Sequence, residues 1–229
     1  IGFAIGQFVS GFSNEDLNKE QQAYQRRVKT GSRFEQTQSG DFEICLLVLA
    51  SIVIKADGKV DQRELDFVRN QFVNMYGKQR ANNAFKLFNG IIKKEVSARQ
   101  VCIQIRQNMP HASRLQLVHF LFGIAKSDQY VVQAELEEIK KIAGYLYVNL
   151  QDYESIKAMF FDVSANAYKI LEISESASNE EVKKGYRKMV KKYHPDKLQD
   201  LGEAHLKGAN EKFQSIQSAY ETIKKERGM

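Results

Sequence analysis

A short stretch near the C-terminus, from Asn179 to Tyr193 (NEEVKKGYRKMVKKY), constrains the fold more than any other part of the chain. Its apolar side chains recur with the period of an α-helix and form one stripe: Val182, Tyr186, Met189, Val190 and Tyr193. Its cationic side chains share the opposite, solvated face: Lys183, Lys184, Arg187, Lys188, Lys191 and Lys192. The stretch therefore predicts a helix that buries one side and presents a positive side to solvent.

Both ends of this helix are marked in the sequence. Ser178, followed three residues later by Glu181, has the pattern of a capping box. Proline disfavours the α conformation in the residue before it, so the helix should end close to His194, which precedes Pro195. His194, Pro195 and Asp196 should then form a stiff, polar, exposed corner at the end of a positive rod. We interpret this arrangement as a docking surface for another protein.

The composition indicates an all-α protein. The chain has 229 residues, only two prolines, 43% hydrophobic and 27% charged residues, which suits one large or two modest globular domains. Further helices are expected over these ranges: Phe42–Ala56, Gln62–Met75, Gln79–Lys94, Ala98–Asn108, Ala112–Lys126, Gln133–Leu146, Asp152–Met159, Asn166–Leu171 and Ala209–Ile223. The first of these is apolar but too short for a membrane span, so it should be a core helix.

The charge balance does not point to nucleic acid. The net charge is +6, and much of it sits in the basic helix rather than along a groove with interleaved aromatic residues. Cys45 and Cys102 lie in apolar helical context and should be buried and reduced. No Cys-x-x-Cys pair occurs, so a zinc module is not expected, and nothing in the sequence calls for a cofactor.

The N-terminal residues 1–12 (IGFAIGQFVSGF) are apolar and glycine-rich. A disordered or cloned leader would explain them, but we favour the remnant of a longer membrane anchor, since about twenty residues are needed to span a bilayer. Residues 13–40 should form a polar juxtamembrane linker. Their basic residues Arg26, Arg27 and Lys29 suit the cytoplasmic side of such an anchor.

The middle of the chain contains an internal repeat. The turn Asp57–Val60 with Glu64 is matched by Asp128–Val131 with Glu135, at a constant offset of 71 residues. Each copy follows an apolar helix and precedes an amphipathic one. Two helix–turn–helix halves are therefore expected to pack face to face in one bundle.

The carboxylates of this repeat are weak candidates for a divalent metal site, because two matched turns could bring hard oxygen ligands together. The candidates are Asp57, Asp61, Glu64, Asp128 and Glu135. Their spacing does not match an EF-hand loop, so helix capping and solvated turns are the favoured interpretation. In particular, Asp61 and Glu64 have the pattern of a second capping box.

Catalysis is not expected. His194 and Asp196 could exchange protons, but no nucleophile, oxyanion donor or third orienting residue accompanies them in the sequence. Neither His111 nor His119 has a neighbour suited to metal ligation, and His119 should be a core residue.

These features carry a family resemblance. The segments Ala167–Ile173 (AYKILEI), the basic helix, His194–Lys197 (HPDK) and Ala209–Ile223 (ANEKFQSIQSAYETI) resemble, in this order, the J-domain of DnaJ-type co-chaperones. The resemblance covers residues 165–229 and implies an antiparallel helical hairpin. Phe213, Ile216, Tyr220 and Ile223 should face the apolar stripe of the basic helix, and Lys197–Gly208 should form an extended loop. Gly185 departs from the family, which usually has alanine there.

Residues 41–160 resemble the TerB-like (tellurite-resistance) helical domain through the Lys-Ala-Asp-Gly turn at Lys55–Gly58. A TerB-like domain before a C-terminal J-domain is similar to membrane-anchored DnaJ-like proteins of the DjlA type. The resemblance implies a co-chaperone at the cytoplasmic face of the inner membrane. It would dock on a DnaK-family ATPase through the six basic residues and His194-Pro195-Asp196, and stimulate ATP hydrolysis.

In this interpretation the TerB-like domain acts as a sensor or targeting module. The alternative is a TerB-like stress or metal-response scaffold with an accessory J-domain. The sequence leaves open the client, the ligand of the TerB-like domain and the oligomeric state.

Overall fold

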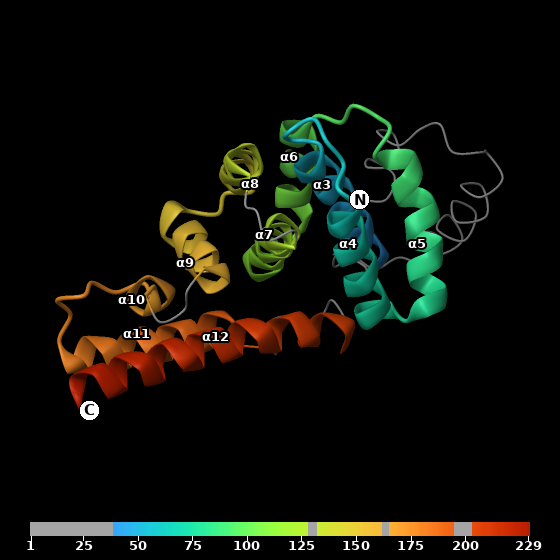
Figure 1. Ribbon diagram of the computed structural model, residues 1–229. Coiled ribbons are helices and arrows are strands. Elements are labelled where there is room, and N and C mark those ends of the chain that lie inside the picture. The colour runs from blue at the N-terminus through green and yellow to red at the C-terminus, as the bar shows by residue number, and fades with distance from the viewer. Residues whose placement is uncertain (1–38, 128–131, 162–164, 195–202) are drawn as a thin grey trace, which may run out of the picture.

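The computed structural model of the chain describes residues 39–127, 132–161, 165–194 and 203–229. Within these ranges every regular element is a helix, which confirms the expected all-α fold. The elements, labelled as in Figure 1, are α3 (Ser39–Ile54), α4 (Gln62–Tyr76), α5 (Lys78–Ile91), α6 (Ala98–Asn108), α7 (His111–Lys126), α8 (Gln133–Tyr145), α9 (Leu150–Phe160), α10 (Ala167–Ile170), α11 (Asn179–Lys192) and α12 (Glu203–Arg227). Apart from α12, their bounds lie within a few residues of those expected.

Helix α3 is the core helix of the N-terminal bundle. It contacts α5, α6, α7 and α8, and its apolar side chains are almost completely buried, from Phe42 to Ile54. Cys45 and Cys102 are buried free thiols, as expected, and burial raises the pKa of Cys102 to about 12. No helix of the described part of the chain is long and apolar enough to cross a membrane. The N-terminal anchor and linker predicted over residues 1–38 lie outside the described residues.

The two halves of the internal repeat share one core. Helices α3 and α7, which precede the repeated turns, pack against each other, and each also contacts α8. The predicted capping box at the start of α4 is present. The Asp61 side chain accepts from the backbone N–H groups of α4, and the Glu64 carboxylate accepts from the Asp61 N–H. Glu64 and Glu135 occupy equivalent buried positions at the starts of α4 and α8. The Asp128–Val131 turn lies outside the described residues.

Helices α11 and α12 form the expected antiparallel hairpin, with α10 packed on α12 (Figure 1). The Tyr186 and Tyr220 rings stack with their centroids 4.2 Å apart. Arg227, near the end of α12, donates to the carbonyl oxygens of Glu175 and Ala177, just before α11 begins. These contacts tie the last turn of α12 to the segment just before α11 and agree with the antiparallel direction of the two helices.

The start of α12 differs from the expectation. An extended loop was predicted over Lys197–Gly208, but α12 already begins at Glu203. Residues 203–207 (EAHLK) include several strong helix formers, and the cost of about 1 kcal/mol for Gly208 in a helix is small beside the packing of the following turns. The predicted loop is therefore wrong from residue 203 onward, and residues 195–202 lie outside the described ranges.

Gly185, the position that departs from the J-domain pattern, lies where the chain before α11 approaches the helix closely. A Cβ atom at this position would come within 2.7 Å of Ile173 Cγ2 and within 3.3 Å of the Leu171 carbonyl oxygen. The missing side chain thus lets the segment after α10 pack directly against α11.

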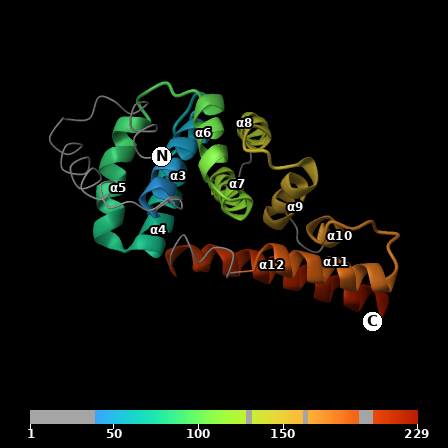
Figure 2. The same ribbon diagram turned by 180° about the vertical axis from the view of Figure 1, so that it is seen from behind.

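The hairpin packs against the bundle rather than standing apart from it. Figures 1 and 2 show α12 running from beneath α10 to the end of α4, and contacts between α12 and α4 and between α10 and α9 agree. The Ser155 hydroxyl of α9 donates to the Ile170 carbonyl oxygen at 2.8 Å. The Gln151 amide donates to the Glu172 carbonyl oxygen at 3.1 Å. The C-terminal module therefore meets the bundle through specific hydrogen bonds.

Candidate functional site

The basic helix α11 begins with the capping box that the sequence predicts. The Ser178 hydroxyl accepts from the Glu181 N–H at 3.3 Å, and the Glu181 carboxylate accepts from the Ser178 N–H at 2.7 Å. The backbone N–H and the hydroxyl of Ser178 both donate to the Glu181 carboxylate and lower the pKa of Glu181. On the other side of the helix Val182 and Met189 are buried, which fixes the rotation of α11 and places its lysines toward solvent.

Three cationic side chains form an exposed stripe along α11: Lys184, Arg187 and Lys191. They recur at i, i+3 and i+7 and so share one helix face. None of them forms an ion pair with another residue of the described ranges. Lys183 lies beside this stripe and makes only a long 3.8 Å contact with the exposed Glu180 carboxylate.

The remaining two predicted cations, Lys188 and Lys192, pair with carboxylates of the protein itself, although the Lys188 side chain is still 58% exposed. The Lys188 ammonium lies 2.8 Å from Glu172 Oε2, and the Lys192 ammonium pairs with both Glu172 Oε1 and Asp152 Oδ1. The six basic residues are thus not equivalent. Lys188 and Lys192 neutralise Glu172 and Asp152, whereas the other four make no comparably close ion pair among the described residues.

The corner that follows α11 is described only at its first residue. His194 is exposed, whereas Tyr193 before it is buried. Burial, together with the charges of Asp152 and Glu172, raises the pKa of Tyr193 well above its ordinary value. Pro195 and Asp196, the other two predicted corner residues, lie outside the described residues. The described part therefore places His194 directly beyond a buried aromatic anchor.

Sequence reasoning missed the partner of His111. Its Nε2 atom lies 2.9 Å from Asp152 Oδ2, although 41 residues separate the two in sequence. Asp152 is 3% exposed. Burial raises the pKa of this carboxyl, but the hydrogen bonds and charges of Lys192 and His111 outweigh burial and leave the pKa below its ordinary value. Only the packing of α9 between α7 and α10 brings these groups together.

A buried lysine was also missed. Lys212 of α12 is fully buried, and its ammonium donates to the Gln116 side chain of α7. Burial holds the pKa of Lys212 well below its ordinary value, against a smaller opposing effect of Glu211. His119 on α7 packs on the Phe160 ring at 4.5 Å, as expected of a core histidine. Burial and the nearby Lys212 charge lower the pKa of His119.

The weak metal candidates that the structure describes do not form a metal-binding group. Asp57 accepts from the Lys59 N–H at 2.8 Å, and Asp61 pairs with Arg63 at 2.9 Å while it caps α4. The interaction with Arg63 lowers the pKa of Asp61 to about 2. Asp128 lies outside the described residues. Among the residues described, no group of three His, Cys, Asp or Glu side chains could hold a metal ion.

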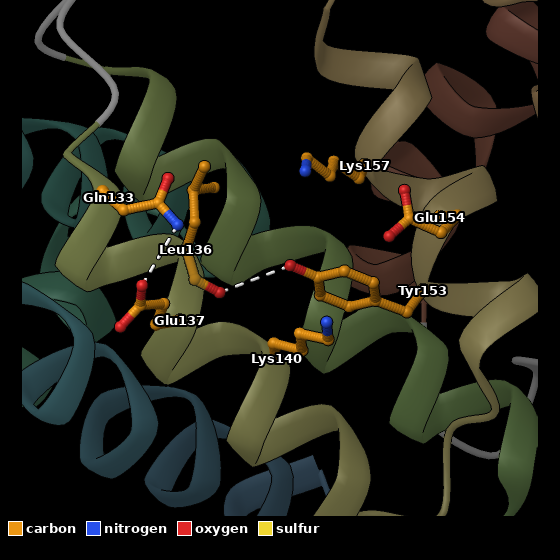
Figure 3. A pocket seen from close by; sticks show the side chains of 7 residues that line it. All are labelled: Gln133, Leu136, Glu137, Lys140, Tyr153, Glu154 and Lys157. Carbon is orange, nitrogen blue, oxygen red and sulfur yellow. Dashed lines mark hydrogen bonds between the residues drawn. The ribbon is translucent and has the colours of Figure 1, made fainter.

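The helical bundle carries a shallow pocket between α8 and α9 (Figure 3). The Tyr153 hydroxyl, on one side, donates to the Leu136 carbonyl oxygen at 3.3 Å, and the Gln133 amide donates to Glu137 at 3.2 Å. Glu154, Lys140 and Lys157 complete the lining. Two acidic and two basic side chains give the pocket no net preference for an anion or a cation.

Comparison with known proteins assigns both parts of the chain. The family described as "Tellurite resistance protein TerB" matches residues 43–158, and the family described as "DnaJ domain" matches residues 166–228. The first match spans just over half of the chain, so the chain belongs to the TerB family and carries a C-terminal DnaJ domain.

In this order of domains the chain is similar to proteins named "Co-chaperone protein DjlA". The Vibrio parahaemolyticus protein is 29% identical over 84% of this chain and 80% of its own length. The Coxiella burnetii protein is 26% identical over 100% of this chain and 93% of its own length. The Vibrio cholerae protein is 51% identical over 28% of this chain, a match that spans only 24% of that relative. No solved structure gives a significant match.

Proposed function

We propose that the chain is a co-chaperone that docks on a DnaK-family ATPase and stimulates its ATP hydrolysis. The observation that carries this proposal is the exposed stripe Lys184–Arg187–Lys191, which leads along α11 to the exposed His194. A row of cations on a rigid helix attracts an acidic partner and speeds the encounter, whereas His194 and the two residues after it supply a directional contact. The DnaJ domain and the names of the relatives support the same partner class.

Stimulation requires that the chain bind one conformation of the ATPase more tightly than another, because only differential affinity shifts a conformational equilibrium. Contacts of the positive helix and of the residues from His194 onward would have to be satisfied together, and this makes docking sensitive to the partner's conformation. We propose no catalytic reaction of the chain itself: in this scheme the ATPase supplies all the chemistry.

We further propose that the TerB domain acts as a sensor or targeting module at the cytoplasmic face of the inner membrane. The apolar, glycine-rich residues 1–12 and the basic residues that follow support attachment there. Fractionation of cells that express the natural protein tests this assignment: recovery with the inner membrane is expected, and full recovery with the soluble proteins would contradict it.

The docking proposal is tested by the single-turnover ATPase rate of a DnaK-family chaperone with the full chain and with two corner variants, His194→Gln and Asp196→Asn. Both variants should abolish stimulation and leave the helical content unchanged. Lys225→Gln, which removes an exposed charge of α12, is the matched control and should stimulate normally. Normal stimulation by either corner variant would refute the proposal.

A further inference from the structure

Glu172 lies between the DnaJ domain's basic helix and the bundle and holds two lysines of that helix. Its two carboxylate oxygens pair with Lys188 and Lys192, and its side chain is only 1% exposed. Its backbone carbonyl accepts from Gln151 of α9. Glu172 also has a positive φ of 56°, the left-handed conformation that closes the C-terminus of α10, where the Ile173 N–H donates to the Tyr168 carbonyl oxygen. The position of this carboxylate is thus fixed from several sides.

The two lysines differ in how far they are withdrawn from solvent. The Lys188 side chain is 58% exposed and has one carboxylate partner among the described residues. The Lys192 side chain is 17% exposed and has two, Glu172 and Asp152. Lys188 could therefore reach an external partner if it left Glu172, whereas Lys192 is held inside the contact between the two domains.

An external partner cannot use the charge of Lys188 without a cost. Removing the lysine from Glu172 leaves a buried carboxylate with less compensation, which is unfavourable because a charge out of water needs a partner. Lys188 lies four residues after Lys184 and three before Lys191, and so lies at the edge of the exposed stripe. An acidic surface that docks on the stripe therefore competes with Glu172 for the Lys188 ammonium.

We propose that Glu172 is an internal competitor that weakens docking of an acidic partner on α11. This inference rests on the proposed function and identifies Glu172 as a residue that sets the affinity of docking. Asp152 of the TerB domain shares Lys192 with Glu172 and also holds His111. The TerB domain therefore takes part in the competition, because any loosening of Asp152 leaves Lys192 to Glu172 and weakens the hold of Glu172 on Lys188.

The test measures the concentration of the full chain that gives half-maximal stimulation of a DnaK-family ATPase, at low and high salt. Glu172→Gln frees Lys188 and should lower this concentration by roughly fivefold at low salt, the factor that corresponds to one surface ion pair near 1 kcal/mol. The gain should shrink at high salt because exposed charges are screened. Glu226→Gln is the matched control: it removes the same charge from an exposed position of α12 in the same module, and Glu226 forms no ion pair with a cation of α11 among the described residues.

A double variant assigns the gain to the freed cation. In Glu172→Gln/Lys188→Gln most of the gain should disappear, because Lys188 is no longer available to the partner. Asp152→Asn is a second, independent variant and should give a smaller gain of the same sign. Circular dichroism and thermal unfolding of each variant confirm that the compared chains are folded.

The outcomes separate this inference from the proposed function. Stimulation by the unaltered chain with no gain in Glu172→Gln, or a gain equal to that of Glu226→Gln, would overturn the inference alone. A gain that persists in full in the double variant would also overturn it. No stimulation by the unaltered chain or by any variant would overturn the proposed function and the inference with it, whereas stimulation only by Glu172→Gln would support both.

Discussion

Lys192 of the DnaJ domain and Asp152 of the TerB domain form an ion pair across the contact between the two domains. Asp152 also accepts a hydrogen bond from His111 of α7. Lys192 in turn also pairs with Glu172. A single chain of polar and charged groups thus joins α7, α9 and α11. The helix proposed to dock on the ATPase is anchored to the TerB domain, and this relationship leads to several predictions.

The first prediction concerns Asp152→Asn. Because Asp152 is buried between the Lys192 ammonium and the His111 ring, the variant should lose about 1–3 kcal/mol of unfolding free energy at pH 7. The partners hold the folded pKa of Asp152 below its ordinary value of 3.8. The contribution of ionised Asp152 to the unfolding free energy is therefore complete above pH 3.8 and is lost as the pH falls through the folded pKa.

Urea unfolding of wild type and Asp152→Asn from neutral to strongly acid pH measures this dependence. The two curves of unfolding free energy against pH should converge below the folded pKa. The exposed Glu180→Gln variant is the control and should follow wild type throughout. A difference between wild type and Asp152→Asn that stays constant down to the lowest pH would contradict the assignment.

The second prediction concerns Lys212→Met. A fully buried lysine whose pKa is lowered costs stability at pH 7, so an apolar side chain of similar length should raise the unfolding free energy by about 1–3 kcal/mol. Between the folded pKa and the ordinary value of 10.5 the unfolded chain binds more protons, so wild-type stability should rise with pH in this window. The variant should lack this rise.

The corresponding measurement is chemical unfolding of wild type and Lys212→Met at pH 7 and near pH 10. The advantage of the variant should shrink at the higher pH. Lys225→Met on the exposed face of the same helix should change little. A variant less stable than wild type at pH 7 would show that the Lys212–Gln116 contact outweighs the cost of burial.

The third prediction uses two glycines of helices. Gly185→Ala should destabilise the chain by about 1 kcal/mol, because overpacking against Ile173 and the Leu171 carbonyl exceeds the gain in helix propensity. A Cβ atom at Gly144 of α8 would meet no neighbouring atom within 4 Å, so Gly144→Ala should stabilise the folded chain by about 0.5–1 kcal/mol. Thermal midpoints of both variants should move in opposite directions, and a rise for Gly185→Ala would show that Ile173 gives way.

The fourth prediction separates the exposed stripe of α11 from the paired lysines of the same helix. Arg187→Gln should raise the concentration needed for half-maximal ATPase stimulation by roughly fivefold at low salt, since this exposed charge is available to a partner. Lys192→Gln should change that concentration less, because the charge of Lys192 is already neutralised by Asp152 and Glu172. Equal effects of the two variants would contradict the division into an exposed stripe and internally paired lysines.

Much of this fold follows from local patterns. Helical periodicity and capping boxes place α4 and α11 almost to the residue, because both signals are written within a few positions. The pairing of His111 with Asp152 and the burial of Lys212 could not be predicted, since they depend on how distant helices pack. The early start of α12 was missed because Gly208 weakens the local helical pattern, whereas its neighbours favour it.

The same distinction applies to the candidate site. The sequence identifies all six cations of α11 from their spacing, but spacing alone assigns them to one solvated face. Glu172 divides them, and it lies before the helix at a position that carries no motif. The role of a charged residue at a helix surface thus depends on the partner that the tertiary structure brings to it.

The most direct test of the central claim is hydrogen exchange of the full chain, free and with an ATP-bound DnaK-family chaperone. Slower amide exchange is expected along α11 and at His194, with no change around the pocket between α8 and α9. Protection confined to the pocket, or unchanged exchange across α11, would contradict docking through the basic helix.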